Sequence, residues 1–104
     1  LLDLRYNDLT DVSGVVLGKA LETNTTLAVI RLLDNRFGED TGIAIGEAMT
    51  KNKSLEVLNI WNSNLGEKGG AAIIRGLENN TTLTALELPS NNLGDNIGVV
   101  IQNH

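Results

Sequence analysis

The fold of this chain is decided by a stretch of twelve residues, Leu27-Ala-Val-Ile30-Arg-Leu32-Leu-Asp-Asn35-Arg-Phe37-Gly38. The pattern returns 28 residues later as Leu55-Glu-Val-Leu58-Asn-Ile60-Trp-Asn-Ser63-Asn-Leu65-Gly66, and again as Leu83-Thr-Ala-Leu86-Glu-Leu88-Pro-Ser-Asn91-Asn-Leu93-Gly94. The N-terminus enters it part-way, as Leu2-Asp-Leu4-Arg-Tyr-Asn7-Asp-Leu9. The shared form is L-x-x-L-x-L-x-x-N-x-L. The 104 residues therefore hold three full units of 28 and part of a fourth.

The second half of each unit repeats at the same interval. Glycine recurs at Gly14, Gly42, Gly70 and Gly98, and an acidic residue recurs at Asp11, Glu39, Glu67 and Asp95. The string Asn-x-Thr/Ser-Leu begins at Asn24, Asn52 and Asn80. Matches of three kinds in one phase indicate a repeat architecture in which each unit stacks on its neighbours.

Each unit is predicted to form a strand, a turn and a helix. Ile30 and Leu32 lie two residues apart, so they share one face of a short strand. The Asn of the pattern is expected to bond backbone groups where the chain leaves the strand, with a weaker turn at Ser63. The following residues have helical spacing, and the acidic residues fall in the first turn, where they complement the helix dipole. We attribute the recurrent helix glycines to close approach of each helix to its strand.

This pattern resembles the leucine-rich repeats, and its 28-residue unit is similar to the ribonuclease-inhibitor-like subtype. That subtype is found in ribonuclease inhibitor, NOD-like receptors and Ran GTPase-activating protein. The resemblance implies an α/β solenoid of curved, right-handed βα units, with a parallel sheet on the concave face and helices on the convex face. We expect a single array over residues 1–104, with units 1–26, 27–54, 55–82 and 83–104. Because neither end has a polar capping repeat, we expect open ends and a longer parent array.

The resemblance implies that protein partners bind the concave sheet, where the residues between the buried leucines face solvent. Stacking the units places these residues in rows. The candidate partner-binding residues are Arg5, Tyr6, Arg31, Leu33, Asp34, Asn59, Trp61, Asn62 and Glu87. Trp61 beside Leu33 is the most informative pair, because exposed Trp residues are common binding anchors. Two alternatives stay open: Trp61 only packs on its neighbours, and the arginines only pair with Asp3 or Asp34.

Catalysis and cofactor binding find little support in the sequence. The chain has no cysteine and a single histidine, His104, so a His-dependent triad or a metal cluster is not expected. The net charge of −5 disfavours nucleic-acid binding, and no apolar run is long enough to span a membrane. The three N-x-[ST] sequons share one repeat position, which a helix-to-strand loop explains. With the absence of cysteine, this favours an intracellular, cytoplasmic setting.

Two hypotheses for function follow. The first is a non-enzymatic interaction or scaffold module that binds a protein partner of unknown identity on the concave sheet. The second is a structural segment that packs through its open ends against neighbouring repeats or subunits. A GTPase-activating role is disfavoured, because the resemblance ties that activity to an arginine-bearing loop and the chain shows no extended loop of this kind. No cofactor, metal, nucleic acid or membrane is expected as a ligand.

Overall fold

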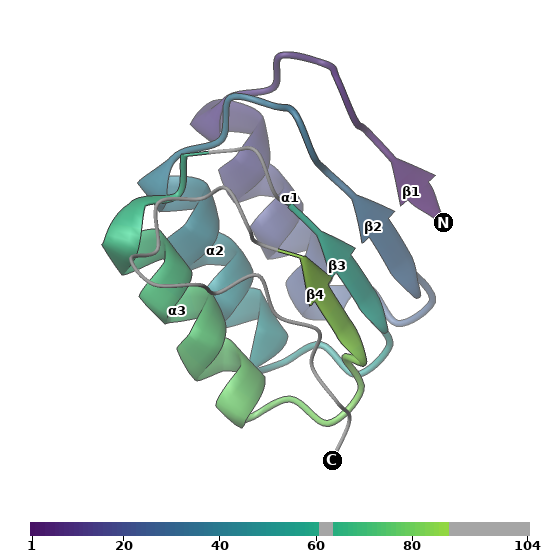
Figure 1. The fold of residues 1–104 in the computed structure, drawn as a ribbon. Helices are drawn as coiled ribbons and strands as arrows, with labels where there is room; N and C mark the ends of the chain where they lie inside the picture. Colours follow the sequence, from purple (N-terminus) through teal and green to yellow (C-terminus); the bar gives the residue numbers. More distant parts are fainter. Residues whose placement is uncertain (61–63, 88–104) are drawn as a thin grey trace.

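The structure, a computed structural model, describes residues 1–60 and 64–87 and consists of alternating strands and helices. The strands are β1 (Leu2–Asp3), β2 (Val29–Arg31), β3 (Val57–Asn59) and β4 (Ala85–Glu87). The helices are α1 (Asp11–Thr23), α2 (Glu39–Met49) and α3 (Gly66–Glu78). Figure 1 shows two layers, with the strands side by side on one side and the helices on the other. This is an open α/β solenoid of stacked strand–helix units, as the sequence predicts.

The sheet is parallel throughout and keeps the chain order β1-β2-β3-β4. Each strand residue pairs with the residue 28 places further on, as Ile30 does with Leu2 on one side and Leu58 on the other. The repeat length is therefore the strand register. In such a register, side chains of the same repeat position form continuous rows across the sheet.

The core lies between the two layers and is built from the apolar repeat positions. Ile30, Leu32, Leu58, Ile60 and Leu86 are fully buried, which confirms the predicted inner face of the strands. The helices contribute a second set of buried side chains, among them Leu21, Ile45, Met49, Ile73 and Leu77. Removing this apolar surface from water, at about 25 cal/mol per Å², is the main force that holds the units together.

The helix glycines contact the neighbouring helix, whereas the sequence predicts that they contact the strand of their own unit. A Cβ placed on Gly42 would lie 2.6 Å from the Cα of Gly69 in the next helix, and one on Gly18 would lie 2.7 Å from the Cβ of Ala44. For Gly14, whose added Cβ would meet Thr41 of α2, and for Gly42, the expected close approach of helix to strand is therefore wrong. These glycines let neighbouring helices pack backbone to backbone, because stacked units must keep the helix spacing compatible with that of the strands. Gly98 lies outside the described residues.

Asparagines of the repeat connect consecutive units. The Asn35 amide nitrogen donates to the carbonyls of Leu32 (2.9 Å) and of Leu4 in the preceding unit (2.8 Å). Its Oδ1 accepts from the backbone N–H groups of Asn7 (3.0 Å) and Leu9 (2.9 Å). Asn35 thus satisfies four backbone groups at the turn, which confirms its predicted role. Ser63, where a weaker turn is predicted, and the unit beyond Glu87 lie outside the described residues.

The sequon asparagines make a second ladder at the opposite ends of the strands. The Asn52 amide donates to the carbonyls of Leu21 (2.8 Å) and Asn24 (3.2 Å), while its Oδ1 accepts from the N–H groups of Ser54 and Leu55. Asn80 repeats this arrangement one unit later, and both side chains are buried. The helix-to-strand loop therefore accounts for these sequons, as predicted.

Acidic residues at the helix starts also act across units. Asp11, in the first turn of α1, accepts through Oδ1 from the N–H of Gly38 (2.8 Å) and from the N–H (3.1 Å) and hydroxyl (2.5 Å) of Thr41. It therefore caps α2, whose own N-cap residue, Gly38, has no side chain. Burial acts to raise the pKa of Asp11, but the bonds from Thr41, Gly38 and Asp40 together hold it below its ordinary value.

Candidate functional site

The concave face of the sheet, turned away from the helices, carries the first row that the sequence predicts. Asp3 pairs with Arg31, Arg31 with Asn59, and Asn59 with Glu87, so these four positions run across all four strands. They alternate along the strands with the buried leucine and isoleucine positions. The register thus brings four positions that lie far apart in the sequence side by side across the sheet.

Arg5 is held within its own unit. Its Nε donates to Asp3 Oδ1 (2.8 Å) and its Nη2 to Asp3 Oδ2 (2.7 Å), a bidentate pair. This bond holds the pKa of Asp3 below its ordinary value, and the backbone N–H of Arg5 and the charge of Arg31 act in the same direction. Arg5 therefore forms the ion pair with Asp3 that the sequence left open as an alternative to partner binding.

Arg31 differs from Arg5, because it forms no ion pair with a carboxylate among the described side chains. Its charge is close enough to Asp3 to lower the pKa of that carboxyl. Arg31 is half-buried in the middle of the row, between Asp3 and Asn59. Among the described residues, Arg31 is therefore an arginine of this face without an ion pair.

The turn that follows each strand presents Tyr6 and Asp34 at equivalent positions. Both have left-handed backbone, with φ of 60° and 59°, and Tyr6 is 67% exposed. The Tyr6 N–H donates to the Leu33 carbonyl of the next unit (3.2 Å), which fixes the turn. Asp34 is half-buried and already has an interaction partner. Of the two, Tyr6 offers an aromatic surface at the edge of the row.

Leu33 does not lie on the solvent-facing surface. Its side chain is only 6% exposed, so the expectation that it forms part of an open apolar patch is wrong. The pattern assigns alternate faces only while the backbone stays in the strand, and β2 ends at Arg31, two residues earlier. Beyond that point alternation no longer applies, and Leu33 is buried without belonging to the core cluster between the sheet and the helices. Trp61 and Asn62 lie outside the described residues, as does the side chain of Glu87.

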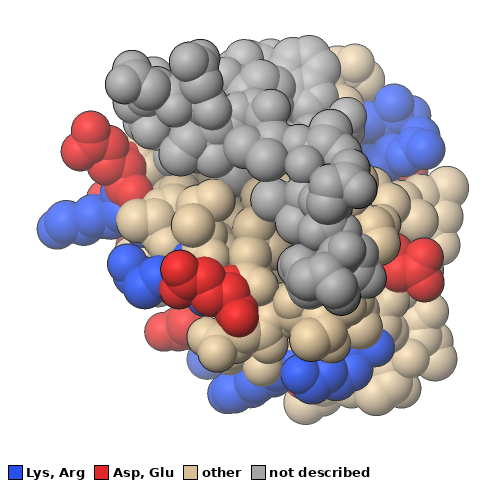
Figure 2. Space-filling model, turned by 60° about the horizontal axis from the view of Figure 1, so that its bottom comes forward, with Lys and Arg blue, Asp and Glu red and all other residues tan. Residues whose placement is uncertain are grey.

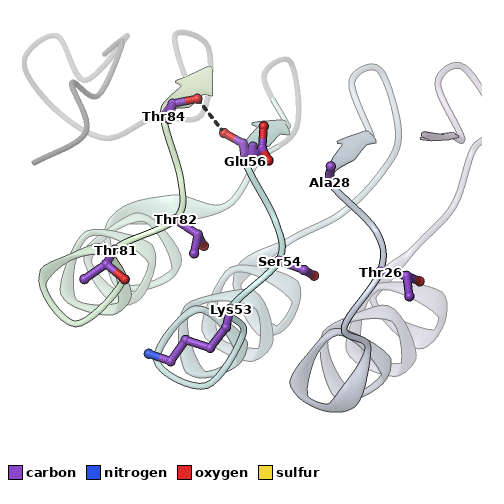
Figure 3. Close-up of a pocket in the computed structure, with 8 residues that line it drawn as sticks. All are labelled: Thr26, Ala28, Lys53, Ser54, Glu56, Thr81, Thr82 and Thr84. Carbon is purple, nitrogen blue, oxygen red and sulfur yellow. Dashed lines mark hydrogen bonds between the residues drawn. The ribbon is translucent and has the colours of Figure 1, made fainter.

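A groove that the sequence prediction did not include runs along the opposite edge of the sheet, where the strands begin (Figure 3). It has a volume of about 600 Å³ and is lined by Thr26, Ala28, Lys53, Ser54, Glu56, Thr81, Thr82 and Thr84. The hydroxyls of Ser54, Thr82 and Thr84 donate to main-chain carbonyls 27 or 28 residues earlier in the chain, at 2.9 to 3.1 Å. The lining residues fall at three repeat positions, namely 26, 54 and 82, then 28, 56 and 84, and finally 53 and 81. The hydroxyl residues at 26, 54 and 82 are the sequence signal by which the groove could have been found. The hydroxyls mainly join consecutive units.

The described residues offer no constellation for metal chemistry. Within residues 1–60 and 64–87, no three His, Cys, Asp or Glu side chains are grouped so that they could hold a metal ion. Over the same ranges, no helix combines the length and apolar character needed to cross a bilayer. On the face drawn in Figure 2, acidic and basic side chains are intermingled. His104 lies outside the described residues.

Comparisons with known proteins agree with this architecture. A family model described as Leucine Rich repeat matches residues 1–18 and 79–101. A solved structure titled Leiomodin-1 Actin-Binding Site 2 (ABS2) superimposes with a TM-score of 0.81 and 30% sequence identity over 88% of this chain. The chain spans about half of that structure, 53% of its length. A search of curated proteins gave no match. The chain is therefore similar to leucine-rich repeat proteins in sequence and in fold.

Proposed function

We propose that this chain is a non-catalytic module that binds a protein partner on the concave face of its sheet. The observation that carries the proposal is the cross-strand row of positions Asp3, Arg31, Asn59 and Glu87, in which Arg31 forms no ion pair with any described side chain. The similar solved structure is itself titled an actin-binding site, which supports a protein as the ligand. The 28-residue units are compatible with the ribonuclease-inhibitor-like subtype.

The partner's chemistry follows from the residues of this face. Arg31 presents donors in a planar fork that suit a carboxylate, so an acidic side chain of the partner would sit over the middle of the sheet. Tyr6 is exposed and offers an aromatic anchor. The sequence suggests Trp61, which lies outside the described residues, as a second one. We place such a module inside the cell, in the cytoplasm.

A GTPase-activating role has less support. The resemblance to Ran GTPase-activating protein implies that this activity needs an arginine on an extended loop. Within residues 1–60 and 64–87, the connections between strands and helices are short, and the two arginines of the concave face, Arg5 and Arg31, lie at or next to strands. Nucleic acid is not the expected partner, because the net charge is −5 and Figure 2 shows acidic side chains among the basic ones.

The experiment compares two charge reversals that are matched in size. Arg31→Glu removes a cation from the concave face, whereas Lys19→Glu makes the same change on an exposed position of helix α1. Monomeric actin is the first probe, and capture from a cell lysate is the second. A hydrogen bond to a charged group contributes about 1.5–3 kcal/mol, so Arg31→Glu should weaken binding by about tenfold or more.

Lys19→Glu should leave binding within about twofold of the wild type, because it lies on the helical side. Circular dichroism should give the same helix content for all three proteins. Equal losses in the two variants, or full binding by Arg31→Glu, would rule out the concave face. If the wild-type chain fails to bind actin but captures another protein in an Arg31-dependent way, the module is supported and actin is excluded.

A further inference from the structure

A row of apolar side chains crosses the concave face beside the row that contains Arg31. Val29 pairs with Val57, and Val57 pairs with Ala85, so the three positions lie side by side on β2, β3 and β4. Each of them precedes a fully buried core residue of its strand and is itself half-buried, as expected for a side chain that points to the face away from the core. We call Val29, Val57 and Ala85 the apolar row.

The apolar row runs across the strands because the strands themselves are short. β2, β3 and β4 have 3 residues each, and the middle residue faces the core. Each strand therefore presents one apolar and one polar position to the concave side, about 6.6 Å apart. The described helices lie on the other side of the sheet (Figure 1). An element that covers the whole apolar row must therefore lie across the strands rather than along one of them.

The spacing of the apolar row favours one kind of element. Neighbouring strands of a sheet lie about 4.8 Å apart, so the row from β2 to β4 spans about 9.6 Å. Two turns of an α-helix cover about 10.8 Å, which places one turn over each strand with a total mismatch of about 1.2 Å. In an extended segment, residues on one side repeat about every 6.7 Å, so two repeats cover about 13 Å and fall out of step with the strands.

Arg31 determines which edge of such a helix is polar. It lies on β2 two residues after Val29, and it forms no ion pair with a carboxylate among the described side chains. A helix about 10 Å in diameter covers the apolar row and the row of Arg31 together. An Asp or Glu on the edge of the helix beside Arg31 gains a charge-assisted hydrogen bond. At β4 the apolar row ends in the smaller Ala85, which leaves room for a larger apolar side chain.

We propose that the apolar row and Arg31 together bind an amphipathic α-helix of the partner protein, laid across β2, β3 and β4. The apolar residues of this helix recur every three or four positions and contact Val29, Val57 and Ala85 in turn. An acidic residue lies within one turn of the residue over Val29, and the largest apolar side chain lies two turns away, over Ala85. This inference rests on the proposed function, because it names the class of partner for the same face.

The test presents the full chain to two phage-displayed libraries that differ in the shape of the ligand. One library is randomised along the exposed face of a helix in a small, stable helical bundle, and the other along one strand of a stable β-hairpin. The affinity of the selected binders is then measured for the wild type, Arg31→Glu and Val57→Lys. Val12→Lys is the matched control, because Val12 is 80% exposed on helix α1.

Val57→Thr is a second variant at the central position, and it keeps the β-branched shape of valine while replacing a methyl group by a hydroxyl. It serves in place of Val57→Lys if the lysine variant does not fold. Circular dichroism and the urea midpoint show which variants are folded.

The helical library should yield binders that carry Asp or Glu beside their apolar residues. Val57→Lys should weaken these binders by about tenfold or more, because it places a charge against an apolar side chain. Arg31→Glu should weaken them by a similar factor, because it sets two carboxylates against each other. Val57→Thr should weaken them by about threefold, and Val12→Lys should leave their affinity within about twofold of that for the wild type.

Two results would overturn the proposal and leave the proposed function standing. The helical library could yield no binders, in which case the comparison of Arg31→Glu with Lys19→Glu still tests the concave face by itself. Alternatively, the helical binders could depend on Arg31 but tolerate both changes at Val57. Binders from either library that neither Arg31→Glu nor Val57→Lys weakens would contradict the concave face as the binding surface, and the proposed function with it.

Discussion

Replacing Asn52 with alanine tests how far the asparagine ladder holds the units together. Its side chain is 1% exposed and makes four hydrogen bonds, to the carbonyls of Leu21 and Asn24 and from the N–H groups of Ser54 and Leu55, at 2.7 to 3.2 Å. Asn52→Ala leaves all four backbone groups without this partner in a site that water reaches poorly.

The magnitude follows from the number and burial of these groups. Each buried polar group left without a partner costs about 1–3 kcal/mol, and some regain water as the loop relaxes, so we expect a loss of about 3–5 kcal/mol. That is a large share of the roughly 5–15 kcal/mol by which a domain is stable. Urea unfolding followed by circular dichroism at the helix band measures the difference in the free energy of unfolding.

Asn24 is the matched control, because it has the same residue type and repeat position but is exposed. Its Oδ1 accepts from two N–H groups, Thr26 (3.1 Å) and Leu27 (2.7 Å), and its amide bonds no described residue. Asn24→Ala should cost about 1 kcal/mol or less, since water replaces the lost bonds. If the two substitutions cost the same within about 0.5 kcal/mol, the inter-unit bonds of Asn52 do not stabilise the fold and the reasoning is refuted.

Two further predictions concern the contacts between helices. Gly42→Ala should lower the urea midpoint by an amount worth about 1–2 kcal/mol. The new Cβ would lie 2.6 Å from the Gly69 Cα, and this overpacking outweighs the gain of about 1 kcal/mol in helix propensity; a raised midpoint would disprove the close packing. Asp11 has a pKa lowered on folding, so its stabilisation is complete above its ordinary value of about 3.8 and is lost as pH falls through its folded pKa. In Asp11→Asn, the free energy of unfolding should therefore fall less steeply as the pH drops below about 4. An unchanged slope would show that the charged Asp11 carboxylate does not stabilise the start of α2 through Gly38 and Thr41.

Much of the candidate site could be predicted from the repeat length. A period of 28 residues fixes the strand register, so the row from Asp3 through Arg31 and Asn59 to Glu87 follows by counting. Leu33 could not be assigned in this way. The strand ends at Arg31, and beyond that point alternation no longer decides which way a side chain faces. Likewise, the sequence left open whether each arginine binds a partner or pairs with Asp3 or Asp34, and only the structure showed that Arg5 pairs with Asp3.

The sequence by itself determined the unit, its length, its apolar face and the asparagines at its turns, because each of these depends on residues close together in the chain. The tertiary structure decided what the small and polar positions contact across units. The glycines of α1 and α2 pack against the next helix rather than the strand, and Asp11 caps a helix 28 residues away from its own. Such contacts depend on the distance between stacked units, which the pattern within one unit does not contain.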